Sequence, residues 1–82
     1  MRAIAELPHP DCRISIFSMN GKFIIKIEQG SLEQVYKIAE INVPDGVDGV
    51  FALLDEAFIQ SVTERFDAMR QSFHETFRRY DA

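Results

Sequence analysis

The stretch CRISIFSMNGKFIIKIEQG, residues 12–30, decides the fold of this chain. Two runs rich in β-branched side chains flank Asn20-Gly21, a pair in which both residues can take the positive φ that a two-residue type I′ turn requires. A loop of two residues fixes the strand register, because the numbers of paired residues must then add up to 41. This register places Ile16 opposite Ile25, so the sequence predicts an antiparallel hairpin.

The two faces of the predicted hairpin differ in chemistry. One face carries four isoleucines in opposed pairs: Ile14 with Ile27 and Ile16 with Ile25. On the other face Phe17 opposes Ile24 and Arg13 opposes Glu28, so apolar meets apolar and the charges are complementary. We expect the isoleucine face to contact the rest of the domain.

The neighbouring segments extend the hairpin into a larger sheet. Gly30-Ser31 suits a second tight turn, and residues 32–41 are rich in strand-forming side chains, so we predict a third strand that pairs Ile25 with Tyr36. A helix over 31–41 is the alternative, because a Ser-x-x-Gln capping box precedes apolar residues at helical spacing. Residues 2–7 are a candidate fourth strand. The prediction is a three- or four-stranded antiparallel meander over residues 1–43.

Two helices are predicted after the sheet. The Pro-Asp-Gly sequence at 44–46 interrupts the strand pattern, and Asp45 or Asp48 is placed to cap a short helix that ends at Leu53. A second helix is predicted to begin at Asp55 and to run to about Tyr80. One unbroken helix from Asp48 is the alternative. The fold class expected is therefore α+β, with residues 1–82 as a single domain and 44–82 as its helical part.

The long helix carries a regular apolar stripe with steps of 4, 4, 3, 4, 4 and 3 residues. Its members are Phe58, Val62, Phe66, Met69, Phe73, Phe77 and Tyr80. Twenty-five helical residues span about 37 Å, whereas a strand of eight residues spans about 27 Å. The helix should therefore outrun its own sheet, leaving Phe73, Phe77 and Tyr80 as candidate interface residues.

A second candidate surface lies on the predicted sheet, on the face opposite the four paired isoleucines. It consists of Phe17, Met19, Ile24 and Val35, which stand among basic side chains such as Lys22 and Lys26. One face of an antiparallel sheet is commonly solvated and polar. An apolar patch on that face therefore indicates an interface.

No arrangement of side chains points to catalysis, a metal or another cofactor. His9, Asp11 and Cys12 lie close in sequence, but a zinc site needs four ligands and no second paired motif follows. Residues 44–56 lack the ligand order of a calcium loop, and His74 borders the apolar stripe without a nucleophile beside it. We predict a protein that is not an enzyme.

Composition limits the classes of partner and the compartment. The formal charge is −4, and residues 44–82 carry all of it, with four arginines against eight acidic residues, which disfavours nucleic acid as a partner. The only cysteine, Cys12, fits a reducing compartment. Neither a signal peptide nor a membrane span is predicted, so the expected location is cytoplasmic.

These observations favour a small interaction domain, most simply a homodimer that self-associates through the distal helix and the second face of the sheet. One alternative is a small acidic regulator that binds a different protein with the same surfaces. Another is a ligand-binding or enzymatic module, with a pocket under Tyr36 or a site formed at a subunit interface.

Overall fold

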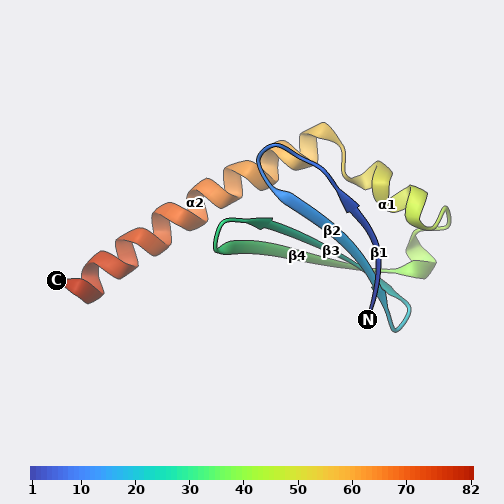
Figure 1. The fold of residues 1–82 in the computed structure, drawn as a ribbon, viewed down its shortest axis with the longest axis horizontal. Coiled ribbons are helices and arrows are strands. Elements are labelled where there is room, and N and C mark those ends of the chain that lie inside the picture. Colours follow the sequence, from blue (N-terminus) through green and yellow to red (C-terminus); the bar gives the residue numbers. More distant parts are fainter.

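The computed structural model describes residues 1–82 and shows an α+β fold, in which a four-stranded antiparallel sheet precedes two helices (Figure 1). The sheet order is β1-β2-β3-β4, so every strand pairs with its neighbour in sequence. The elements are β1 (Arg2–Leu7), β2 (Arg13–Met19), β3 (Lys22–Gln29), β4 (Leu32–Ala39), a 3-10 turn (Glu40–Asn42), α1 (Val47–Leu53) and α2 (Glu56–Asp81). The predicted fold class is thus confirmed.

The hairpin between β2 and β3 has the register predicted from its turn. Ile16 pairs with Ile25 and Arg13 pairs with Glu28. Asn20 and Gly21 both have positive φ, 52° and 75°, as a type I′ turn demands. The loop length therefore determined which isoleucines face the core.

β4 is a strand, so the alternative of a helix over residues 31–41 is wrong. Its pairing with β3 follows the second predicted register and places Ile25 beside Tyr36. This register also opposes Glu28 to Glu33, an unfavourable pair of like charges. Lys26 Nζ lies 3.6 Å from the Glu33 carboxylate and partly offsets the repulsion.

β1 is the fourth strand, and it pairs with β2 through an irregular register. The pairing shifts between Ala3 and Ala5, which leaves Ile4 as the extra residue of a bulge. Arg13 Nε on β2 donates to Glu6 Oε1 on β1 at 2.8 Å and links the two strands beyond this bulge.

The helical part contains two helices, so the alternative of one unbroken helix is wrong. The chain leaves helical geometry at Leu54, and α2 starts again with Asp55 as its N-cap, whose Oδ1 accepts from Phe58 N at 2.8 Å. The prediction that Asp45 or Asp48 caps α1 is wrong. Gly46, at φ 66°, is the N-cap residue and no side chain caps this helix, because Asp48 already lies within its first turn.

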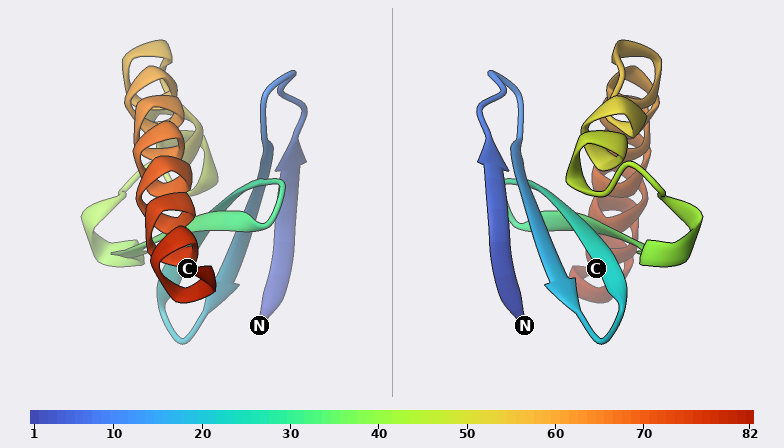
Figure 2. Two further views of the ribbon diagram at one scale, coloured as in Figure 1. Left: turned by 90° about the vertical axis from the view of Figure 1, so that its left-hand side faces the viewer. Right: turned by 90° about the vertical axis from the view of Figure 1, so that its right-hand side faces the viewer.

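Both helices lie against one face of the sheet, and the core lies between these layers (Figure 2). A cluster of nine buried residues forms it: Ile14, Ile16, Phe23, Ile25, Ile27, Val43, Val50, Val62 and Phe66. The four isoleucines of the predicted hairpin face are all members. The other face of the sheet, called the open face below, is covered by no helix.

The molecule is elongated, because α2 continues well past the sheet (Figure 1). Its 26 residues span about 39 Å, and the principal extents are 50 × 26 × 19 Å. The radius of gyration is 14.9 Å, against about 12 Å for a compact chain of this length. The solvent-accessible surface is 5893 Å², whereas a compact 9.4 kDa monomer exposes about 5000 Å². The excess, about 900 Å², is surface that the chain does not bury against itself.

Candidate functional site

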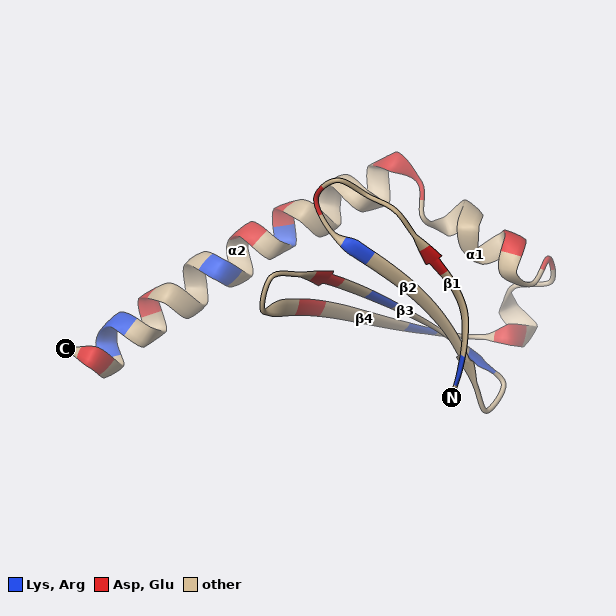
Figure 3. Ribbon diagram, in the orientation of Figure 1, with Lys and Arg blue, Asp and Glu red and all other residues tan.

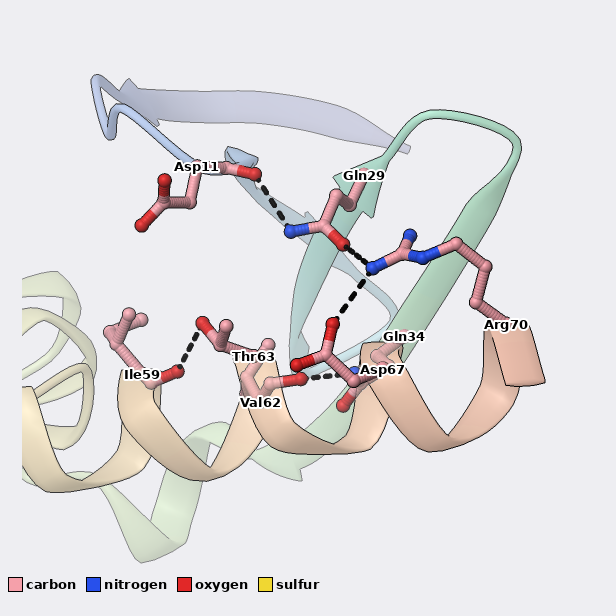
Figure 4. Close-up of polar contacts among 8 residues, drawn as sticks. All are labelled: Asp11, Gln29, Gln34, Ile59, Val62, Thr63, Asp67 and Arg70. Carbon is pink, nitrogen blue, oxygen red and sulfur yellow. Dashed lines mark hydrogen bonds and ion pairs between the residues drawn. The ribbon is translucent and has the colours of Figure 1, made fainter. Parts of the chain in front are cut away.

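α2 is fixed to the sheet through β4 by a buried polar group, Gln34 (Figure 4). Its Nε2 donates to the backbone carbonyl of Val62 at 3.0 Å. Its Oε1 accepts from Tyr36 Oη and from Arg65 Nη1, the latter at 3.1 Å. Because a buried amide without partners is destabilising, these bonds hold one part of the helix at one place on the sheet.

Arg70 marks the last point at which α2 touches the sheet through a hydrogen bond (Figure 4). Its Nη2 donates to Gln29 Oε1 at 2.7 Å, next to the turn between β3 and β4, and to Asp67 Oδ1 at 3.0 Å. Gln29 in turn donates to the carbonyl of Asp11 at 2.9 Å. Every residue from position 70 onward is exposed.

The distal stripe, defined as Phe73, Phe77 and Tyr80, therefore projects into solvent. These side chains are 65%, 55% and 82% exposed, and the rings of Phe77 and Tyr80 contact each other at a centroid distance of 6.0 Å. Phe66, on the same stripe, is fully buried. The two halves of the stripe thus have the same chemistry but different surroundings.

The stripe repeats after 11 residues. Phe58, Val62 and Phe66 recur as Met69, Phe73 and Phe77, and Met69 recurs as Tyr80. A period of 3.67 residues stays almost on one line of a straight helix. The first repeat packs on the chain's own sheet. In the second repeat Met69 still packs against this core, whereas Phe73, Phe77 and Tyr80 continue the apolar line where nothing in the chain covers it.

Charged residues of both signs occur along the distal part of α2 (Figure 3), and Arg70 and Asp81 are the two that lie beside the distal stripe. Arg70, Glu75, Arg78, Arg79 and Asp81 all lie in this part of α2, and Arg70 is the only one that takes part in a salt bridge within the chain. An apolar centre with a polar rim is the usual anatomy of a protein interface.

The open-face patch, defined as Phe17, Met19, Ile24 and Val35, is less prominent than the sequence suggests. Met19 and Val35 are 38% and 45% exposed and Phe17 is half-buried, but Ile24 is only 7% exposed. Ile24 lies on a central strand between Phe17 and Lys37, which cover it from both sides. The patch therefore offers three side chains to a partner, with Ile24 as their support.

Sequence reasoning missed several exposed apolar residues. Ile4 is 38% exposed because the bulge in β1 breaks the alternation of faces, and no signal in the sequence marks a bulge there. Ile41 is 90% exposed in the 3-10 turn, and Phe51 and Leu53 are 37% and 46% exposed on α1. The shortness of α1 was a usable signal, since two turns can bury only one or two side chains.

Cys12 and His9 are the nearest approach to a reactive pair. Cys12 Sγ lies 3.7 Å from His9 Nδ1, which also accepts from the backbone N–H of Asp11 at 3.1 Å. Burial, and secondarily the charge of Asp11, raise the pKa of the Cys12 thiol. A nucleophilic cysteine needs a lowered pKa, and the shift at Cys12 has the opposite direction. No three side chains of the metal-binding types converge.

A small apolar recess lies under Tyr36, close to the kink between the helices. Its volume is about 250 Å³ and it is lined by Ile25, Tyr36, Lys37, Ile38, Leu53 and Phe58. The Tyr36 and Phe58 rings meet edge to face at 5.3 Å. Ligand pockets usually enclose about 300–1,000 Å³ and combine several polar groups, whereas Lys37 is the only charged residue here.

Comparisons with protein-family models, with curated proteins and with solved structures find no match to this chain. Neither helix is long and apolar enough to cross a bilayer.

Proposed function

We propose that this protein is a non-enzymatic interaction domain that forms a homodimer through the distal stripe, with the open-face patch as a second contact surface. The observation that carries the proposal is the exposure of Phe73, Phe77 and Tyr80 on a helix that extends beyond its own sheet. A monomer gains nothing from extending an aromatic line into water, whereas a second copy supplies an identical line to cover it.

The exposed area is sufficient for a dimer. A large aromatic side chain presents about 150–250 Å², so the three exposed fractions correspond to about 300–500 Å² per chain. Complete burial on two chains would contribute about 15–25 kcal/mol at 25 cal/mol per Å². Association costs about 4–15 kcal/mol, and the stripe supplies about half of the roughly 800 Å² that each partner contributes to a standard interface.

The alternatives have weaker support. A ligand-binding module would use the recess under Tyr36, which is smaller than usual and offers one charged group. A regulator of a different protein would use the distal stripe in the same way, but nothing in the chain selects a heterologous partner over a second copy. The proposed location is cytoplasmic, because a single cysteine fits a reducing compartment.

The test is the double substitution Phe73→Asp with Phe77→Asp. We expect a monomer by light scattering that keeps the circular dichroism spectrum of the native chain, because both residues lie outside the core. The matched control is Ala68→Asp with Gln71→Asp, which adds the same two charges at exposed positions on the opposite side of α2. This control should remain a dimer.

Two results would overturn the proposal. If the chain unfolds on substitution of Phe73 and Phe77 while the control stays folded, the distal stripe is part of the core. If the double variant remains a dimer of unchanged mass, the interface lies elsewhere, and the patch around Phe17 is then the next surface to substitute.

A further inference from the structure

The orientation of the two helices in such a dimer follows from the side chains beside the distal stripe, and this inference rests on the proposed function. At 100° per residue, Arg70 and Asp81 lie about 60° and 80° round the helix from Phe73, on the same side of the stripe. They are separated by 11 residues, or about 16 Å along the axis. An arginine and an aspartate therefore flank one edge of the stripe at its two ends.

Arg70 and Asp81 both have polar atoms that form no hydrogen bond or salt bridge within the chain. Both hydrogen bonds of Arg70 within the chain use Nη2, which leaves Nη1 and Nε for another carboxylate. Asp81 takes part in no salt bridge within the chain. The distal helix thus presents, at one end of the stripe, an arginine that is paired with Asp67 through Nη2 alone and, at the other end, a carboxylate with no salt bridge.

An antiparallel arrangement of two copies satisfies these groups. When two identical helices face each other about a two-fold axis perpendicular to both, each edge of one stripe meets the same edge of the other in reverse order. A register in which paired residue numbers add up to 150 or 151 places Phe73 opposite Phe77 of the second copy. The same register places Arg70 beside Asp81 of the second copy, and the two-fold axis repeats this contact between Asp81 and Arg70 of the second copy.

A parallel arrangement does not pair these charges. About a two-fold axis that runs along the helices, the edge that carries Arg70 and Asp81 meets the opposite edge of the second copy, and Arg70 lies about 16 Å along the axis from Asp81 of that copy. The four arginines contributed by positions 78 and 79 also gather at one end, and the two helix dipoles point the same way. Like-charge contacts across an interface are unfavourable and exclude incorrect arrangements.

We infer that the partner of the distal stripe is a second copy of this chain, bound antiparallel with Phe73 against Phe77 and Arg70 against Asp81. The stripe can maintain this contact over three turns because its 11-residue period keeps it almost straight on each helix. The contact begins at Arg70, where α2 leaves its own sheet, so the two sheets lie at opposite ends of the paired helices.

Cysteine cross-linking distinguishes the two orientations. The variants are made in a Cys12→Ser background, which removes the only native thiol. They are Arg70→Cys alone, Asp81→Cys alone, and both changes in one chain, each treated with a short bis-maleimide. In the antiparallel dimer, like positions are about 16 Å apart and unlike positions are adjacent. We therefore expect cross-linked dimers from the double variant and from a mixture of the two single variants, but not from either single variant by itself.

The control is the double variant Gln71→Cys with Arg79→Cys, which has nearly the same position along the axis but lies on the opposite side of α2. It should not cross-link. Cross-linking of either single variant in a chain that is still dimeric would show parallel helices and overturn this inference while leaving the proposed function intact. A dimeric mass with no cross-link in any variant would place the interface elsewhere and also overturn it. A monomeric mass for the unmodified chain would instead overturn the proposed function itself.

Discussion

Phe66 and Phe77 provide the most informative pair of substitutions, because they occupy equivalent places in the 11-residue repeat of α2. Phe66 is fully buried under the sheet, whereas Phe77 is 55% exposed beyond it. We compare Phe66→Ala with Phe77→Ala. The chemical change is identical in the two variants, so any difference between them reports the surroundings of each ring.

The two substitutions should lower different free energies, that of unfolding for Phe66→Ala and that of dimerisation for Phe77→Ala. Phe66→Ala removes a core ring and should lower the free energy of unfolding by about 3–5 kcal/mol, out of a total of about 4–12 kcal/mol for 82 residues. Phe77→Ala should affect the isolated chain little. Instead it should weaken the dimer, whose stability rises by about 1.4 kcal/mol for each tenfold increase in protein concentration.

Urea denaturation at two protein concentrations tenfold apart measures both effects. The free energy of unfolding falls by about 1–3 kcal/mol for each molar of urea. The urea midpoint of the native chain should therefore be about 0.5–1.4 M higher at the higher protein concentration. Phe66→Ala should lower the midpoint at both concentrations, and Phe77→Ala should reduce its dependence on concentration. If Phe77→Ala instead lowers the midpoint as much as Phe66→Ala at both concentrations, Phe77 is a core residue and the distal stripe is not an interface.

Three further predictions concern the fold and Cys12. Gly21→Val should lower the melting temperature by an amount equivalent to about 1–2 kcal/mol. The cause is backbone strain alone, because no atom beyond the adjoining residues lies within 4 Å of the added Cβ. An unchanged melting temperature would refute the type I′ turn, and Gly21→Asn is the control that should be tolerated. Asp55→Ala should cost about 1 kcal/mol in chemical denaturation through loss of the α2 cap, whereas equal losses for Asp55→Asn and Asp55→Ala would contradict a capping role. The rate of Cys12 alkylation should have its pH midpoint above that of an ordinary thiol, and Asp11→Asn should lower that midpoint. The folded state keeps the thiol proton to higher pH than the unfolded state does. The free energy of unfolding should therefore fall as pH rises above about 8.5, the thiol pKa of the unfolded chain. A Cys12 midpoint below the ordinary value would contradict the burial of this thiol.

The sheet could be predicted in detail because turn chemistry and alternation act locally. The Asn20-Gly21 turn determined the pairing of β2 with β3, and Gly30-Ser31 did the same for β3 with β4. The cap at Asp55 was likewise a local signal. The bulge at Ile4 could not be predicted, because it depends on how β1 fits against β2 and not on its own sequence.

The start of α1 and the candidate interface show where the sequence was insufficient. Asp45 and Asp48 were both plausible caps, but the positive φ of Gly46 makes that residue the boundary of α1. Alternation placed Ile24 correctly on the open face, but could not show that Phe17 and Lys37 cover it. The length of α2 against the strands did predict the exposure of the distal stripe, because both lengths follow from simple geometry. The single-domain organisation of residues 1–82 stays a prediction.

Sedimentation equilibrium of the unmodified chain over a range of concentrations tests most directly the claim that the distal stripe binds a second copy. The chain mass is 9.4 kDa. We expect a reversible equilibrium that approaches twice this mass as concentration rises, with the dimer fraction reduced by Phe73→Asp. A mass of 9.4 kDa at every concentration would contradict it.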